Sequence, residues 1–457
     1  MSKRQSKKRS AVKFDVLQQI QPNAAGIDVG AEEIYVCVPP GRDQERIRVF
    51  ASFTNDLEAL ADWLVQCGVT TVAMESTGVY WMPLYDILES HGLEVCLVNA
   101  HHLKNVAGRK SDVADCEWLY QLHTYGLLRG SFHPPDEVRV LRTLVRQRDM
   151  LVRYRSAHIL HMQKALEQMN LKLTYVLSDV TGATGMAIIR AILAGEHNPA
   201  VLAQHRNSRC QRSAAEIAQA LTGNYRHEYL FALRQAVELY DYYGQQIAAV
   251  DAELATLYNT LTPPDEELPR TAPPQPRRGK PRKNQVHFDL ASSLYQATGA
   301  DLTQIDGIDV LTAQTVLTEV GWDMSKWPTV KHFTSWLGLC PNNAITGGKV
   351  KRRGRKKTDN RATAALRVAA QSLARSQTAL GAFYRRIKAR HGAPKANIAT
   401  AHKLARIIYH MLNHRLDYHD LGAAQYDEQQ RERAIRHLHK QAAKLGLTVM
   451  PMAPSPA

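Results

Sequence analysis

The order of strand-like and helix-like segments between residues 24 and 99 constrains the fold more than any other feature. Three segments alternate apolar and polar residues as strands do, and Pro39, Pro40 and Gly41 mark the turn between the last two: AAGIDVG, EIYVCVP and RIRVFAS. After them the pattern changes to alternating helix and strand. We expect a helix at 55–67, a buried strand at 69–75, a helix at 79–91 and a strand at 93–99.

Three strands followed by alternating helices and strands are the order of an α/β RNase H-like (RuvC-like) domain. In that fold the first strand and the fourth lie side by side. Asp28 is on the first strand and Glu75 ends the fourth. The order therefore predicts that these two carboxylates meet.

Asp112 and Asp115 add two carboxylates at the start of a helix that we expect to run to residue 125. A spacing of three places both on one helical face. A helix N-terminus also favours carboxylates, so capping of the helix dipole explains either residue taken singly. Together with Asp28 and Glu75 they form a set that cannot stay fully ionised without a counter-charge. Carboxylate oxygens suit hard divalent cations, so the set predicts a Mg²⁺ site that Mn²⁺ could also occupy.

The charge balance points to a polyanionic partner. The chain has 457 residues, enough for two or three domains, and a formal net charge of +15. Such an excess is most simply explained by nucleic acid, the alternative being a merely basic protein. The six cysteines include no CxxC pair, which predicts reduced thiols in a cytosolic protein and neither a zinc ribbon nor a disulfide framework. No apolar run is long enough for a membrane span.

Composition divides the chain into six expected segments. They are a basic disordered arm (1–22), the RuvC-like carboxylate domain (23–135), a helical coiled-coil region (136–260), a Pro-rich basic linker (261–290), a mainly α C-terminal domain (291–420), and a helical segment with a disordered tail (421–457). The linker composition predicts no core there, although its cations could touch phosphates.

Two long helices are expected in the coiled-coil region, at 136–169 and 225–258. In the second, apolar residues recur at spacings of three and four or sums of these: Leu230, Leu233, Val237, Tyr240, Ile247, Leu254 and Leu257. The pattern favours a helical hairpin or a dimer contact over a single helix packed within its own domain.

The C-terminal domain holds a second region of chemical interest. Gly307, in IDGIDVLTAQTVLTEVG, lies in a turn that opens a helix and resembles a helix-hairpin-helix device, whose amides can hold a phosphate. Many helix starts share this pattern. Further on, seven cations crowd nine residues of an expected loop: Lys349, Lys351, Arg352, Arg353, Arg355, Lys356 and Lys357. They predict an anionic partner, the alternative being a solvated charge run.

Thr346 stands just before the paired glycines 347 and 348. A loop hydroxyl beside many cations could attack a phosphodiester, because the cations would stabilise both its alkoxide and the transition state. A threonine that simply shapes the turn is the simpler interpretation.

These residues together resemble the IS110/IS1111-type transposases, which are bridge-RNA-guided DNA recombinases of bacterial insertion elements. The resemblance covers residues 24–170 and 300–415. It rests on GIDVG, MESTGVYW, NAHHLKNVAGRKSDVADCEWL, IDGIDVLTAQTVLTEVG, FTSWLGLCPNN and the GGKV loop.

The resemblance implies a DEDD tetrad that holds Mg²⁺, formed by Asp28, Glu75, Asp112 and Asp115. It also implies a C-terminal transposase domain with a catalytic serine at the position that Thr346 occupies here. Threonine keeps the hydroxyl but adds a β-methyl group that crowds the attack and stiffens χ1.

The resemblance further implies donor and target DNA and a noncoding guide RNA as partners. It implies a dimer or tetramer in which the two catalytic parts can come from different protomers, and a cytoplasmic bacterial location, on the nucleoid during action. Two other functions remain open. One is a RuvC-like structure-specific endonuclease, such as a junction resolvase, that uses water as its nucleophile. The other is a noncatalytic nucleic-acid-binding protein.

Overall fold

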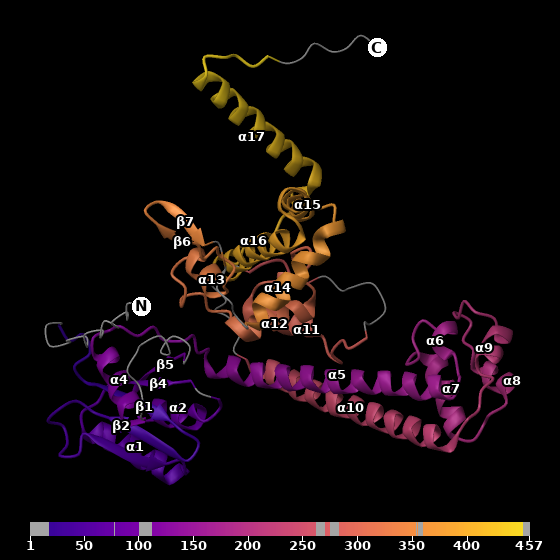
Figure 1. Cartoon of the computed structure of the whole chain (residues 1–457), viewed down its shortest axis with the longest axis horizontal. Helices are drawn as coiled ribbons and strands as arrows, with labels where there is room; N and C mark the ends of the chain where they lie inside the picture. Colours follow the sequence, from indigo (N-terminus) through magenta and orange to yellow (C-terminus); the bar gives the residue numbers. More distant parts are fainter. Residues whose placement is uncertain are drawn as a thin grey trace, which may run out of the picture. The chain divides into compact units, whose positions relative to one another are not determined.

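The computed structural model describes residues 18–76, 78–99, 112–261, 270–274, 283–352, 354 and 360–450. The chain divides into two compact units, Met1–His133 and Pro134–Ala457 (Figure 1). Most of the expected basic arm and the end of the expected tail lie outside the described residues. None of the described helices is long and apolar enough to cross a membrane.

The first unit is built on a five-stranded mixed sheet in the order β3-β2-β1-β4-β5. β2 is antiparallel to both β1 and β3, while β1, β4 and β5 run parallel. This sheet with its flanking helices is RNase H-like, which confirms the predicted fold class. The described elements are β1 (Ala24–Val29), β2 (Glu33–Cys37), β3 (Ile47–Ala51), α1 (Thr54–Gln66), β4 (Thr71–Glu75), α2 (Trp81–Ser90), β5 (Glu94–Val98) and α4 (Asp112–Thr124).

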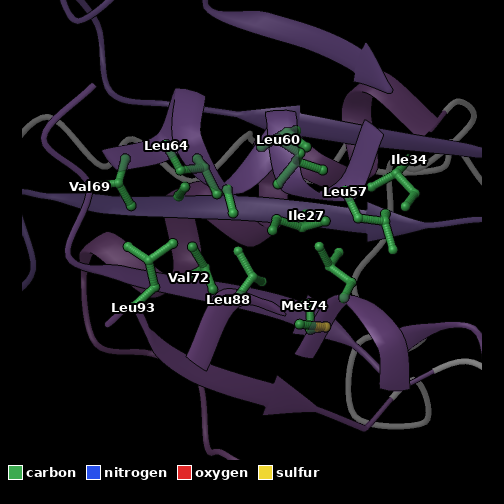
Figure 2. Close-up of a cluster of buried hydrophobic side chains, with 14 of the residues drawn as sticks. Ile27, Ile34, Leu57, Leu60, Leu64, Val69, Val72, Met74, Leu88 and Leu93 are labelled. Atoms are coloured by element: carbon green, nitrogen blue, oxygen red, sulfur yellow. The ribbon is translucent and has the colours of Figure 1, made fainter. Parts of the chain in front are cut away.

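The two faces of the sheet are covered differently. Side chains of a strand alternate between the faces, and Ile27 and Met74 point to the face where they pack on Leu60 of α1 and Leu88 of α2 (Figure 2). The other face is covered by α4, which buries Leu119 against β4 and β5. The apolar core thus fixes which strand residues face α4.

Two long helices of the second unit, α5 (Asp136–Gln168) and α10 (His227–Thr260), lie side by side (Figure 1). They are antiparallel, because Arg148 of α5 bonds to Asp251 of α10, whereas His158, further along α5, stacks on Tyr243. The seam predicted for the second helix therefore belongs to a helical hairpin within one chain. Short helices at the far end share a core with the hairpin: α6 (Leu173–Val176), α7 (Ala183–Leu193), α8 (Pro199–Leu202), η1 (Ala203–His205) and α9 (Ala214–Ala220).

The rest of the second unit is mostly helical, as predicted, and includes one small hairpin of strands. Its described elements are α11 (Leu290–Thr298), η2 (Leu302–Gln304), α12 (Val310–Val320), α13 (Val330–Trp336), β6 (Ala344–Thr346), β7 (Lys349–Arg352), α14 (Arg361–Ser372), η3 (Leu373–Arg375), α15 (Ala379–His391), α16 (Ala393–His414) and α17 (Gly422–Lys444).

A polar residue of the Pro-rich stretch packs against a neighbouring helix, and the expectation that no apolar core forms there stays a prediction. Thr271 is only 2% exposed. Its carbonyl accepts from the Tyr295 hydroxyl at 2.8 Å, and its own hydroxyl accepts from the amide of Asp301 at 2.7 Å. A single small polar residue can satisfy its hydrogen bonds against a neighbouring helix even where the flanking composition is poor in apolar residues.

Candidate active site

Asp28 and Glu75 lie at the same end of two neighbouring parallel strands. The register of β1 and β4 pairs Ile27 with Met74, so the next step along each strand brings Asp28 beside Glu75. Both side chains are half-buried. Because Ile27 and Met74 face α1 and α2, the alternation of the strands directs the two carboxylates to the face that α4 covers. The predicted neighbourhood of the first and fourth strands is confirmed.

Gly26 brings α4 into direct contact with β1. A Cβ atom at this position would lie 2.2 Å from the carbonyl oxygen of Cys116 and 2.3 Å from the amide nitrogen of Tyr120. Both of these are backbone atoms of α4, which cannot move aside as a flexible side chain could. Only glycine therefore allows this distance between the helix and the strand that carries Asp28.

A buried hydrogen bond shows which way α4 runs. His123, near the end of α4, lies 2.9 Å from the hydroxyl of Thr71, the first residue of β4. That hydroxyl donates its proton to the carbonyl of Glu94, so it accepts from the Nε2–H of a neutral His123. Burial lowers the pKa of His123 to about 4, consistent with a neutral ring. Since the end of α4 lies at the start of β4, the start of α4 points toward the Glu75 end.

The start of α4 carries the second pair of carboxylates. Asp112 is the first residue of the helix, and its side chain lies outside the described part of the chain. Asp115, one turn further on, is half-buried with its Oδ1 shielded from solvent. The next residue, Cys116, has its pKa raised to about 12, first by burial, then by Cys37 and by the charge of Asp28. The charge of Asp28 therefore acts on the turn of α4 that holds Asp115.

The donor types in this region suit a hard cation, since all four tetrad candidates supply carboxylate oxygens. Among the residues whose side chains are described, no group of three His, Cys, Asp or Glu side chains converges closely enough to hold a metal ion. The described geometry thus provides the adjacent pair Asp28 and Glu75, with Asp115 on the helix that covers them.

Thr346 lies in the second unit, in a different setting from the one expected. The segment predicted as a loop is a hairpin, in which β6 pairs with β7 and Thr346 pairs with Lys349. Gly347 and Gly348 form its two-residue turn with φ values of 57° and 73°, which glycine adopts without strain. The sequence interpretation predicted a loop and missed the hairpin, although two glycines between short segments are a typical hairpin turn. Thr346 is exposed beside the turn.

The expected basic loop is therefore in part a strand. Lys349, Lys351 and Arg352 belong to β7, and Lys349 and Lys351 are exposed. The remaining cations of the group lie outside the described residues: Arg353, Arg355, Lys356 and Lys357. A two-stranded ribbon with cationic side chains has dimensions that suit a groove of duplex nucleic acid.

Gly307 occupies a tight turn before α12, with a φ of 85°. A Cβ atom there would lie 3.0 Å from the carbonyl oxygen of Ala369 and 3.1 Å from the side chain of Leu373, so the turn packs closely on α14 and η3. Asp306 and Asp309 flank it, accepting from the Ser376 hydroxyl and the Thr312 amide, respectively. Packing and backbone conformation are enough to explain this glycine, and its contact with a phosphate stays a prediction.

Two comparisons with known families bear on this arrangement. A family model for DEDD transposases of the IS110 type matches residues 25–171, the segment that carries all four carboxylates. A second model, for transposases of the IS116/IS110/IS902 family, matches residues 299–385, which include the β6–β7 hairpin. Together they cover just over half of the chain. The chain belongs to the IS110 family of transposases. No curated protein matches it.

Membership of the IS110 family makes the chain a DNA-transposing enzyme with DNA as its partner.

Two features of this transposase that support the site were not predicted from its sequence: Gly26 and the contact between Thr71 and His123. A glycine two residues before Asp28, in an otherwise apolar strand, is a signal of close backbone approach. The Thr71–His123 contact joins residues 52 positions apart and leaves no local pattern.

Proposed function

We propose that this IS110-family transposase cuts and rejoins DNA with a tetrad of Asp28, Glu75, Asp112 and Asp115 and with Thr346 as nucleophile. The observation that supports the tetrad is the position of Asp28 and Glu75, one residue beyond the paired Ile27 and Met74, on the sheet face under α4. The first turn of α4 holds the other two carboxylates. Carboxylates that converge on one place require a counter-charge, and Asp28 and Glu75 already lie side by side on neighbouring strands.

The tetrad residues would hold Mg²⁺, or Mn²⁺ in its place. Such an ion, when bound, polarises the scissile phosphate and neutralises charge that develops during the attack. The protein's own contribution is to position the carboxylates. β1 and β4 fix two of them on rigid strands, and the close contact at Gly26 fixes the helix that carries the others.

The proposed chemistry exchanges one phosphate ester for another. Oγ1 of Thr346 attacks the phosphorus and forms a Thr–O–P bond, its proton passes to solvent, and the cut strand leaves as a free hydroxyl. The free hydroxyl of another strand then attacks the same phosphorus, forms a new phosphodiester and restores the threonine. No external energy source is needed. The exposure of Thr346 beside Lys349 and Lys351 supports this role, because a large substrate can reach it and cations stabilise the transition state.

Sequence recognition would be delegated to a noncoding RNA that pairs with target and donor DNA, while the protein holds backbones. A dimer of the chain would supply two sets of catalytic residues and a tetramer four, and the tetrad and Thr346 of one site can come from different protomers. The net charge of +15 supports binding of several nucleic-acid strands at once.

A trapped protein–DNA adduct tests the nucleophile. A DNA substrate nicked near the cleavage site loses its short product strand, so the covalent intermediate persists on a denaturing gel. We expect a shifted band for the wild-type protein with guide RNA and Mg²⁺, and none for Thr346→Ala. Cleavage that continues in Thr346→Ala, with no adduct in the wild type, would instead indicate the alternative function, a RuvC-like resolvase that uses water.

A further inference from the structure

A long stretch of the second unit carries positive charge without compensation. From Asn360 to Leu416 the sequence has eleven Lys and Arg residues and no Asp or Glu. The stretch forms α14, α15 and α16. Within the described residues, Arg361 alone among these cations forms an ion pair, with Asp149 and Glu319. Like charges this close repel one another unless an anion joins them.

Two of these cations are held over the same pair of aromatic rings. Nζ of Lys403, on α16, lies 4.9 Å from the ring centre of Phe383 and 5.3 Å from that of Tyr426. The guanidinium of Arg386, on α15, lies 5.7 Å from each ring centre, and its Nε donates to the Tyr426 hydroxyl at 3.0 Å. The rings thus fix both side chains in the folded protein. These side chains therefore lose less conformational entropy when they bind a ligand.

Two further arginines complete what we call the α16 basic cluster, which consists of Arg386, Lys403, Arg406 and Arg433. Arg406 follows Lys403 by one helical turn, Arg433 comes from α17, and both are exposed. Burial, followed by the charges of the three arginines, lowers the pKa of Lys403. The fold therefore holds a half-buried ammonium in surroundings that disfavour its charge.

Asp420 is a carboxylate close enough to act on Lys403, but it has another role. It accepts from the backbone amide of Ala379 at 3.0 Å and from that of Gly422 at 2.9 Å. These bonds hold the starts of α15 and α17. Asp420 is thus committed to the backbone and does not form an ion pair with the cluster.

We propose that the α16 basic cluster binds the phosphate backbone of a nucleic acid. Phosphate oxygens would provide the anionic partner that the described residues do not, and guanidinium groups match their geometry. All four residues lie outside the segments that the two family models match. The proposal rests on the proposed function in one respect, that the protein handles nucleic acid, and it adds a contact surface separate from the carboxylate tetrad and the β6–β7 hairpin.

The dependence of nucleic-acid affinity on salt concentration tests the proposal directly. Each phosphate contact that is lost reduces the slope of log K against log salt by about 0.9 for duplex DNA and about 0.7 for single strands. We expect Lys403→Gln/Arg406→Gln to reduce the slope by about 1.8 for a DNA duplex, measured by fluorescence anisotropy with full-length protein. The same measurement with a labelled RNA stem–loop shows whether the cluster serves DNA, RNA or both. A reduced slope with either probe supports the proposal.

Three further variants make the result interpretable. Arg190→Gln/Arg212→Gln removes two cations that already pair with Asp241 and Glu216, and we expect an unchanged slope. Lys403→Arg/Arg406→Lys keeps both charges and should restore the wild-type slope. Arg406→Glu changes an exposed side chain, so it remains informative if loss of Lys403 unfolds the protein. Slopes equal to that of the Arg190→Gln/Arg212→Gln control with both probes would overturn the proposal, while leaving the adduct test of Thr346 unaffected.

Discussion

Thr346 occupies the position at which the resemblance to IS110-type transposases implies a serine, and its surroundings indicate how the β-methyl group would act there. The pairing of Thr346 with Lys349 and the two-glycine turn fix its backbone, so the side chain can adjust only through χ1. A β-branched residue has fewer accessible χ1 states than serine. The resemblance implied a serine at this position, but it did not indicate that Thr346 ends a strand of a β-hairpin.

We therefore expect Thr346→Ser to form the covalent adduct faster than the wild type. Relief of a χ1 restriction worth roughly 0.5–1.5 kcal/mol corresponds to an increase of about 2- to 13-fold. Single-turnover measurements of adduct formation provide the rate. Thr346→Val, which keeps the shape and removes the hydroxyl, should form no adduct. A rate for Thr346→Ser equal to or below that of the wild type would show that the β-methyl group does not limit the attack.

Asp28 and Glu75 lead to a prediction that does not depend on activity. If the tetrad binds Mg²⁺, the ion should stabilise the folded protein, by about 2.7 kcal/mol at a concentration 100 times Kd. The increase in thermal midpoint with Mg²⁺ should disappear in Asp28→Asn, which should also be more stable than the wild type without metal because repulsion is relieved. An Asp28→Asn protein that Mg²⁺ stabilises as strongly as the wild type would contradict the assignment.

At the scale of elements, the first unit could be predicted and the β6–β7 hairpin could not. Strand alternation and helical periodicity located the elements, because each signal lies within a few residues. The order of the elements matched an RNase H-like fold, in which the first and fourth strands are neighbours. The hairpin was not predicted, because seven cations in nine residues indicated a loop that meets an anionic partner. The placement of α4 depends on Gly26. The need for glycine at this position becomes apparent only when α4 is seen packed against β1.

Gly26→Ala should therefore separate α4 from β1. A Cβ atom 2.2 Å from a backbone oxygen requires the helix to shift, and overpacking of this kind costs about 1–3 kcal/mol. We expect a lower urea midpoint for the first unit and loss of stabilisation by Mg²⁺. Gly244→Ala, in the middle of α10, is the matched control, because the atom nearest to the new methyl carbon would lie 3.9 Å away. That change should stabilise by up to about 1 kcal/mol.

His123 predicts how the stability of the same unit depends on pH. Its pKa is about 4 in the folded protein, where burial lowers it from 6.5, so only the unfolded state gains a proton between these values. Stability should fall as pH decreases from about 6.5 to about 4, by up to about 3 kcal/mol, and this contribution should change little below that. Urea midpoints across this range, compared between wild type and His123→Gln, isolate the effect. An equal pH dependence in both proteins would exclude His123 as its source.

At the scale of the whole molecule, long-range polar contacts decide how the helices of the second unit are joined, and sequence patterns do not reveal them. Arg142 of α5 donates to the carbonyls of Thr318 and Glu319 at the end of α12, 176 and 177 positions away. Arg146 forms a bidentate pair with the same Glu319. Helical periodicity predicts that α5 has an apolar side, but not which distant carboxylate its arginines will meet.

The pair Arg148–Asp251 is the most buried of these contacts and gives the sharpest test. Both side chains are at most 4% exposed, and Asp251 also accepts from the amide of His287, so α5, α10 and the last residues of the Pro-rich linker meet there. Asp251→Asn leaves a buried guanidinium without its counter-charge and should lower stability by about 3–5 kcal/mol in urea unfolding. Arg148→Met/Asp251→Leu removes both charges and should recover most of that loss. The pair Arg190–Asp241 joins α7 to the same helix α10 but is exposed, so Asp241→Asn should cost less than about 1 kcal/mol. If Asp251→Asn and Asp241→Asn lowered stability equally, burial of the Arg148–Asp251 pair would not determine its contribution to stability.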